Sequence, residues 1–403
     1  MGIIDSKLLC EDSEFNVTSL HEIKYNLTYV DHIFSTKNRH LFECYKQYKR
    51  CVTVIDKNVY DFYGEQLKSY FDYFNIDLVL YPVTITETNK TIETFESIID
   101  FFDEVKLLRK EPVLIIGGGL ITDPVGFACS AYRRNTPYNR IPTTLIGLID
   151  ASVAIKVAVN HRDKKNRLGA YHASGNVFLD FSFLKTLPDS QMVNGMSELI
   201  KIAVVSQKDI FEKLYKYGVM LLETKFGNIN GNEELRQASV FITYEAIKKM
   251  LQLEIPNLYE LDLERVIAYG HSWSPVLELI PEPHMFHGHA VSIDMAFSAT
   301  IAESRGYITS DAHKKILDLI SNIGLSLDNP YFDEEVAVKG LESIVLTRDG
   351  YQQLAVPRPI GECYFINDLT NTEMLTQLKR HKDICRSYVR EGMGTNVYME
   401  QES

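Results

Sequence analysis

The chain has 403 residues, of which 45% are hydrophobic and 24% are charged, so it is long enough to bury a large core and to form two domains. Its formal net charge of -12 and its pI near 5.5 argue against a role on nucleic acid or on a membrane surface. An anionic ligand would therefore have to be bound by locally gathered lysine and arginine side chains.

Short apolar runs alternate with helical patterns in the first half of the chain, which predicts βαβ units and a mostly parallel sheet. Apolar residues recur at helical spacing over Tyr60–Phe74 and Thr91–Leu108. From Val153 to Val159 they alternate, which favours another strand. The predicted strands of the sheet are Cys51–Ile55, Asp77–Tyr81, Pro112–Ile116, Arg140–Pro142 and Asn176–Leu179.

The pattern becomes helical after Pro188. We place a domain boundary near Leu187-Pro188-Asp189, so that residues 1–187 form an α/β domain and residues 188–403 a mainly helical one. The predicted helices of the second domain are Ser190–Ser206, Lys208–Leu222, Glu233–Glu254 and His289–Arg305.

The six cysteines are scattered and show neither CxxC nor zinc-ribbon spacing. No apolar segment followed by a cleavage site stands near the N-terminus. We therefore expect a cytoplasmic protein with free thiols.

Three glycines, Gly117 to Gly119, follow the apolar run Val113–Ile116 and precede a helix predicted to begin near Thr122. Backbone N–H groups in such a loop can face the pyrophosphate of a dinucleotide. The motif is not GxGxxG, and three glycines also suit a tight turn. Thr143, Thr144 and Asp150 supply groups suited to ribose and amide contacts, although either threonine could instead cap a helix.

Basic side chains gather in one stretch of this acidic chain, which is the pattern that phosphate recognition needs. Lys156 lies in an apolar alternating segment, where a buried ammonium needs an anionic partner. For Arg162, Lys164 and Arg167 taken singly, a solvated loop is the simpler interpretation. The patch comprises Arg133, Arg134, Lys156, His161, Lys164, Lys165, Asn166 and Arg167.

Glu198 and Lys201 lie on one face of an otherwise apolar helix. A surface salt bridge is the usual explanation, but apolar residues all round predict a buried helix, and a metal ion is a suitable partner for Glu198. Two histidines could complete a catalytic zinc site. Spacing alone does not choose among His271, His284, His287 and His289.

A succession of these motifs resembles the sugar phosphate cyclases, the dehydroquinate synthase superfamily, from about residue 50 to residue 385. The resemblance implies a Rossmann-like N-terminal domain and a mainly α-helical metal-binding C-terminal domain. The motifs are Gly117-Gly-Gly-x-x-x-Asp123, Arg140-Ile-Pro-Thr-Thr-Leu145, Asp150-Ala-Ser-Val153, Lys156, Lys165-Asn166-x-x-Gly169, Glu198-x-x-Lys201, Gly270-His271 and His287-Gly288.

The resemblance also implies cofactors, a partner and site residues. Zinc, with cobalt as a possible substitute, would be held by Glu198, His271 and His287. The substrate pocket would contain Lys156, Lys165, Asn166 and Lys201, joined by Arg134 from the second subunit of a homodimer. The implied NAD contacts are Asp56, Glu87, Lys90, Gly118, Gly119, Asp123, Thr143, Thr144, Asp150, Lys165, Phe183 and Thr186.

The chain departs from dehydroquinate synthases around the first zinc histidine. Those enzymes carry an arginine, an asparagine and a second histidine where this chain has Glu264, Ala268 and Pro275. The groups suited to a substrate carboxylate are therefore missing. Ala268–Pro275 and Thr347–Gly350 instead resemble cyclases acting on sedoheptulose 7-phosphate. Within that group the chain looks most like the branch forming desmethyl-4-deoxygadusol, with the 2-epi-5-epi-valiolone branch as the alternative.

Two other classes stay open at this point. Metal-dependent polyol dehydrogenases share the two-domain plan and the glycine loop, but similar enzymes use an aspartate as first metal ligand and do not need Lys156 with Lys165 and Asn166. A non-catalytic descendant would have no reason to keep all three residue sets.

Overall fold

The computed structural model describes residues 3–11, 13–162 and 164–399 and divides into two compact units. Unit 1 runs to Pro142 and includes Ile155–Asp180, and unit 2 comprises Thr143–Ala154 and the chain from Phe181. The predicted α/β fold with a helical C-terminal part is confirmed. The boundary near Leu187-Pro188-Asp189 stays a prediction about domains.

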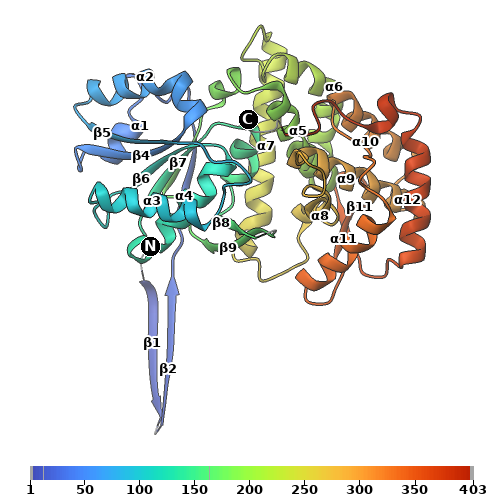
Figure 1. Cartoon of the computed structure of the whole chain (residues 1–403), viewed down its shortest axis with the longest axis horizontal. Helices are drawn as coiled ribbons and strands as arrows, with labels where there is room; N and C mark the ends of the chain where they lie inside the picture. The colour runs from blue at the N-terminus through green and yellow to red at the C-terminus, as the bar shows by residue number, and fades with distance from the viewer. Residues whose placement is uncertain (1–2, 12, 163, 400–403) are drawn as a thin grey trace. The chain divides into compact units, whose positions relative to one another are not determined.

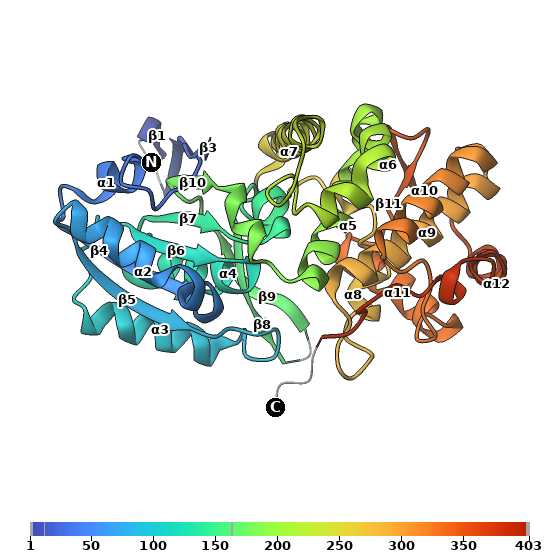
Figure 2. The ribbon, with the colours of Figure 1, turned by 90° about the horizontal axis from the view of Figure 1, so that it is seen from above.

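Unit 1 is built on a six-stranded parallel sheet with the strand order β3-β10-β7-β6-β4-β5 (Figure 2). Helix α2 packs on β4 and β5, and α4 packs on β6 and β7. The elements of the sheet and its helices are β3 (Asn26–Tyr29), α1 (His40–Tyr45), β4 (Arg50–Asp56), α2 (Lys57–Tyr73), β5 (Asp77–Val83), α3 (Ile92–Glu104), β6 (Val113–Gly117), α4 (Gly119–Ala131), η1 (Tyr132–Arg134), β7 (Tyr138–Pro142) and β10 (Asn176–Leu179).

Continuous apolar runs form the middle of this sheet because both of its faces are covered. Val113–Gly117 is buried at every position, and its residues Val113 and Ile115 belong to one core that also contains Val52, Ile121 and Val125. The helix expected to begin near Thr122 begins at Gly119, so Gly118 is its N-cap and Gly119 its first residue.

Two antiparallel hairpins accompany the sheet. Strands β1 (Ile3–Glu11) and β2 (Glu14–His21) stand away from the rest of unit 1 (Figure 1). Their side chains Leu8, Phe15 and Val17 are exposed. Strands β8 (Lys156–His161) and β9 (Lys164–Tyr171) form the second hairpin. Lys164 and Arg167 therefore lie in a strand and not in a loop. Their side chains are nevertheless exposed to solvent, as predicted.

Unit 2 is mainly helical. Helix α9 is buried along almost its whole length and packs against α5, α10 and α12. Within the described residues, no helix is long and apolar enough to cross a membrane. The elements are η2 (Gly147–Ala151), η3 (Phe181–Lys185), α5 (Asp189–Ser206), α6 (Lys208–Glu223), α7 (Glu233–Glu254), η4 (Ile255–Asn257), η5 (Val266–Ala268), α8 (Ser274–Leu277), α9 (His287–Ser304), α10 (Ser310–Ile323), α11 (Glu334–Thr347), β11 (Leu354–Pro357), β12 (Cys363–Ile366), α12 (Asn371–Cys385) and η6 (Val389–Gly392).

A buried histidine in α10 makes the stability of unit 2 depend on pH. Nε2 of His313 lies 3.0 Å from the hydroxyl of Thr300, and burial lowers the pKa of His313 to about 4. The unfolded chain, with an ordinary pKa of about 6.5, takes up a proton that the folded protein does not. Folding free energy is therefore lost as pH falls from about 6.5 toward 4.

We expect His313→Gln to lose less thermal stability on acidification than the wild type, because the variant lacks this titrating group. Unfolding midpoints by circular dichroism at pH 7, 6 and 5 measure the difference. Part of the dependence will remain, because burial also lowers the pKa of His381. Equal slopes for both proteins would contradict the assignment.

Candidate active site

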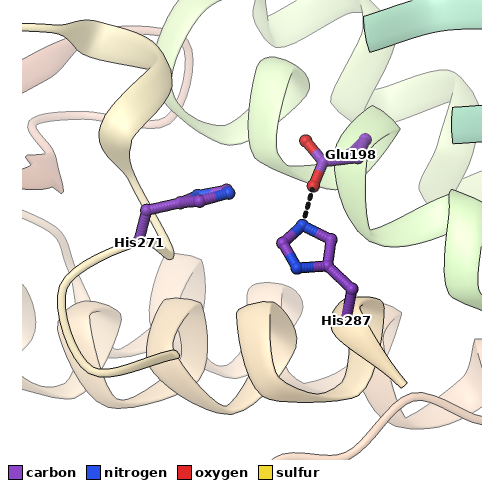
Figure 3. Close-up of side chains that lie close together, drawn as sticks. All are labelled: Glu198, His271 and His287. Atoms are coloured by element: carbon purple, nitrogen blue, oxygen red, sulfur yellow. Dashed lines mark hydrogen bonds and ion pairs between the residues drawn. The ribbon is translucent and has the colours of Figure 1, made fainter. Parts of the chain in front are cut away.

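Three metal-binding side chains from distant parts of the sequence converge in unit 2. Glu198 comes from the middle of α5, His271 from the loop after η5, and His287 from the first position of α9 (Figure 3). One donor atom from each lies within 4.8 Å of the other two. The group contains neither His284 nor His289, so two of the four candidate histidines are brought to Glu198 and two are not.

His287 is held by a carboxylate on each side of its ring. Its Nε2 lies 3.2 Å from Oε1 of Glu198, and its Nδ1 lies 3.2 Å from Oε2 of Glu278 at the end of α8. Burial lowers the pKa of His287, but Glu278 and Glu198 together raise it to about 10. A metal cation bound to Nε2 would neutralise the same two carboxylates in place of the proton. Glu278 would then orient the ring through Nδ1.

The donor set fits a divalent metal ion. Burial lowers the pKa of His271 to about 3, so its imidazole is neutral and keeps a lone pair for coordination. Oε2 of Glu198 is buried and has no hydrogen-bond partner among the described residues, although Lys201 forms an ion pair with it. Two imidazoles and one carboxylate leave coordination positions open, as catalytic zinc sites do. Their role as ligands stays a prediction.

Lys201 links this group to Asp150. Its Nζ lies 3.0 Å from Oδ2 of Asp150 and also contacts Glu198, and only 2% of the residue is exposed. Burial lowers the pKa of Lys201, but Asp150 and Glu198 raise it by more, so the side chain stays an ammonium. Helix α5 is buried, as the sequence predicts, and its charged residues have strong partners. Glu198 and Lys201 pair with each other, and Lys201 also pairs with Asp150, which lies far from it in sequence.

Helices α5 and α9 meet at Gly288. Its N–H donates to Oδ1 of Asn194 at 2.5 Å. A Cβ atom at Gly288 would lie 2.2 Å from the backbone oxygen of Asn194, which no side chain can tolerate. This contact lies one turn from Glu198 and one residue from His287, so it sets the spacing of two donors.

A second polar group lies in unit 1. Nζ of Lys90 donates to Asp123 and to the side-chain oxygen of Asn166, both at 2.7 Å. Lys165 pairs with Glu87 at 3.3 Å. All five residues were predicted as cofactor or substrate contacts, and they join α4, the segment before α3 and the hairpin β8–β9.

The other predicted cofactor contacts take simple local positions. Asp56 caps α2 by accepting from the N–H of Asn58 and Val59, and Gly118 and Gly119 begin α4. Thr144 accepts from the N–H of Gly147, which is the capping role left open from the sequence. Thr143 and Phe183 are buried in unit 2, and the hydroxyl of Thr186 donates to the backbone oxygen of Phe183.

The two remaining predicted substrate residues lie in unit 1. Lys156 begins β8 and is half-buried, not fully buried. Arg134 is exposed in η1 and, with Arg109 and Arg133, lines a cavity of about 490 Å³.

Two polar residues that support these groups, Asn160 and Glu278, were not predicted from the sequence. Asn160 donates to Glu87 and accepts from the N–H of Asn166, and Glu278 orients His287. Neither residue lies in a recognisable motif. An asparagine in an alternating strand was the one available signal.

Comparisons with known proteins agree with this architecture. Residues 80–194 match the family model described as 3-dehydroquinate synthase N-terminal, and residues 195–343 match 3-dehydroquinate synthase C-terminal. The chain is 58% identical to demethyl-4-deoxygadusol synthase of Trichormus variabilis over 398 residues, covering 99% of this chain and 97% of that protein. It is 40% identical to 2-epi-5-epi-valiolone synthase of Streptomyces albus over 326 residues, covering 81% and 79%.

A solved structure extends the agreement to three dimensions. The 2-epi-5-epi-valiolone synthase ValA of Streptomyces hygroscopicus subsp. jinggangensis, with NAD+ and Zn2+ bound, superposes with a TM-score of 0.86 at 36% identity. The match covers 92% of this chain and 99% of that one. The chain therefore belongs to the sugar phosphate cyclases of the 3-dehydroquinate synthase family.

Proposed function

We propose that this protein converts sedoheptulose 7-phosphate to desmethyl-4-deoxygadusol, the first step of mycosporine-like amino acid biosynthesis. The observation that carries the proposal is the 58% identity to a demethyl-4-deoxygadusol synthase over nearly the whole of both chains. The conversion removes phosphoric acid and one water from the sugar phosphate and closes a carbon ring. It involves no net oxidation, so NAD would be a catalytic cofactor.

Three residues close to His271 in sequence support a substrate without a carboxylate. Ala268 is buried at the end of η5, Pro275 lies in the first turn of α8, and Glu264 is an exposed anion. None of the three side chains can donate a hydrogen bond or a positive charge to a carboxylate. Such an anion would lose several kcal/mol if it were buried here without partners.

NAD and a zinc ion, when bound, would supply reversible hydride transfer and the acidification and orientation of a substrate hydroxyl. Glu198, His271 and His287 are suited to hold the metal, and cobalt suits the same donors. Lys90, Asp123, Glu87 and the glycine loop before α4 are suited to hold NAD.

The basic residues have distinct parts in this proposal. Lys201 stays an ammonium, so it can donate a proton in a hydrogen bond to a developing oxyanion and is a poor base. Lys156, Lys165 and Asn166 would bind the phosphate as it leaves, with Arg134 supplied by the second subunit of a homodimer. All six cysteines are free, which supports a reducing cytoplasm.

The first prediction of the proposed function concerns the product. Incubation with sedoheptulose 7-phosphate, NAD and Zn2+ should release phosphate and give a strongly ultraviolet-absorbing product, one water lighter than valiolone, with no accumulation of NADH. Phosphate assay, absorbance and mass spectrometry measure the three quantities.

The same assay separates the alternatives. Phosphate release with a non-absorbing cyclitol would assign the valiolone reaction, which a relative 40% identical to this chain is named for. Net formation of NADH without phosphate would assign a polyol dehydrogenase. Absence of both products would contradict the proposed substrate.

The second prediction concerns the metal. Zn2+ or Co2+ added to chelator-treated protein should raise its unfolding temperature, because binding at 100 times Kd adds about 2.7 kcal/mol to folding stability. His271→Ala and Glu198→Gln should abolish this shift. His284→Ala is the matched control, since its ring contacts the backbone of Pro281 and lies outside the donor group. A shift lost in His284→Ala and kept in His271→Ala would contradict the ligand assignment.

The third prediction concerns the homodimer. Arg134→Ala and His271→Ala should each be nearly inactive alone, but random mixed dimers should recover about a quarter of wild-type activity, because half of the dimers are mixed and one of their two sites is intact. Mixing Lys201→Met with His271→Ala should recover nothing. If the Arg134 mixture also stays inactive, Arg134 does not act across subunits.

A further inference from the structure

The loop that carries His271 is held by a single buried carboxylate oxygen. Oδ2 of Asp294 accepts the backbone N–H groups of Ser272, Trp273 and Ser274 at 2.7, 2.5 and 3.0 Å. These are the three residues directly after His271. The other oxygen of Asp294 accepts from the hydroxyl of Ser298 at 3.2 Å, and Asp294 is 0% exposed.

Such an arrangement needs a reason, because burying a carboxylate is costly unless every oxygen is hydrogen-bonded. Three consecutive N–H groups form a concave anion-binding turn that suits this charge. An apolar side chain would pack a loop on a helix without any desolvation cost, but it would not fix the direction of three peptide groups. The Asp294 carboxylate therefore does more than help to bury the loop. It also fixes the backbone conformation of the loop.

The position of Asp294 connects two of the three donor residues. Asp294 lies in α9, about two turns after His287, so this helix carries His287 and also binds the backbone beside His271. Gly270 brings the loop close to the same stretch, because a Cβ atom there would lie 2.7 Å from Met295 and 2.9 Å from Val291. Its φ of +77° also favours glycine.

A second contact to the loop comes from Arg348, which directly follows α11. Nη2 of Arg348 donates to the backbone oxygen of His271 at 3.1 Å, and its Nη1 donates to the backbone oxygens of Gln352 and Gln353. The His271 peptide is therefore bound on its carbonyl side by Arg348 and on its following N–H groups by Asp294. Both partners are buried.

We propose that Asp294 is a positioning residue of the metal centre, which sets the separation of His271 from His287 through the loop backbone before a cation binds. The inference rests on the proposed metal site. It predicts that the charge of Asp294 matters for metal affinity and coordination geometry, although Asp294 contributes no donor atom itself.

The test is a Co2+ titration of chelator-treated full-length protein, followed by visible absorption, because the d–d bands of cobalt report on coordination geometry. Asp294→Asn keeps the shape of the side chain and removes its charge. We expect it to weaken Co2+ binding about 10- to 100-fold, the usual range for residues behind metal ligands, and to shift or weaken the visible bands. Asp294→Ala should weaken Co2+ binding further. If this variant does not fold, the Co2+ affinity and visible bands of Asp294→Asn test the proposal alone.

Two controls from α9 separate positioning from general destabilisation. Ser298→Ala removes only the contact to the other oxygen of Asp294, and Thr300→Ala removes a buried hydroxyl that contacts His313 and His381 but not the loop. Both should keep wild-type cobalt affinity and bands. An equal loss in Thr300→Ala and Asp294→Asn would overturn the inference.

The outcomes also distinguish this inference from the proposed function. If wild type and His271→Ala bind Co2+ equally, the metal site itself is wrong and the inference falls with it. If only His271→Ala loses binding, while Asp294→Asn keeps wild-type affinity and bands, the metal site stands and the positioning role of Asp294 is overturned.

Discussion

A lysine ammonium enclosed by two carboxylates is the interaction on which the candidate active site of unit 2 depends. Lys201 touches Asp150 and Glu198, and the latter has no exposed surface at all. Loss of this cation would remove one of the compensating charges of a fully buried carboxylate, and breaking a buried ion pair typically costs roughly 3–5 kcal/mol. The pairing allows an apolar helix to present an anionic donor at its centre, and the remaining contacts then orient the histidines around it.

Local patterns predicted many of the regular elements, but not the helices α10, α11 and α12. The strand Asn176–Leu179 and the helix Glu233–Glu254 have the bounds that the sequence predicts, because their apolar spacing matches their burial. The hairpin β1–β2 was not predicted, since its apolar residues are exposed and carry no burial pattern. Motif resemblance found Glu198, His271 and His287, but Asp294, Glu278 and Asn160 act through tertiary contacts that spacing does not encode.

Lys90 and one residue of the basic patch, Lys165, show how an acidic protein can hold cations at a predicted anion-binding site. Lys90 and Lys165 are already engaged with Asp123 and Glu87, so their charges are balanced within unit 1. Balanced cations can be buried and held in place at much lower cost than isolated ones. Under the proposed function, an anionic ligand would be bound by exchange of partners within this network, so the net charge of -12 would not have to be overcome at long range.

The contact at Gly288 has a consequence for the substitutions that α5 and α9 can accept. The distance between α5 and α9 there is limited by main chain against main chain, and only an atom as small as hydrogen separates Gly288 from Asn194. Side chains elsewhere along the two helices can be replaced by larger or smaller ones while the distance between the helices at Gly288 stays the same. Substitutions elsewhere along α5 and α9 can therefore leave unchanged the distance between the Glu198 carboxylate on one helix and the His287 imidazole on the other.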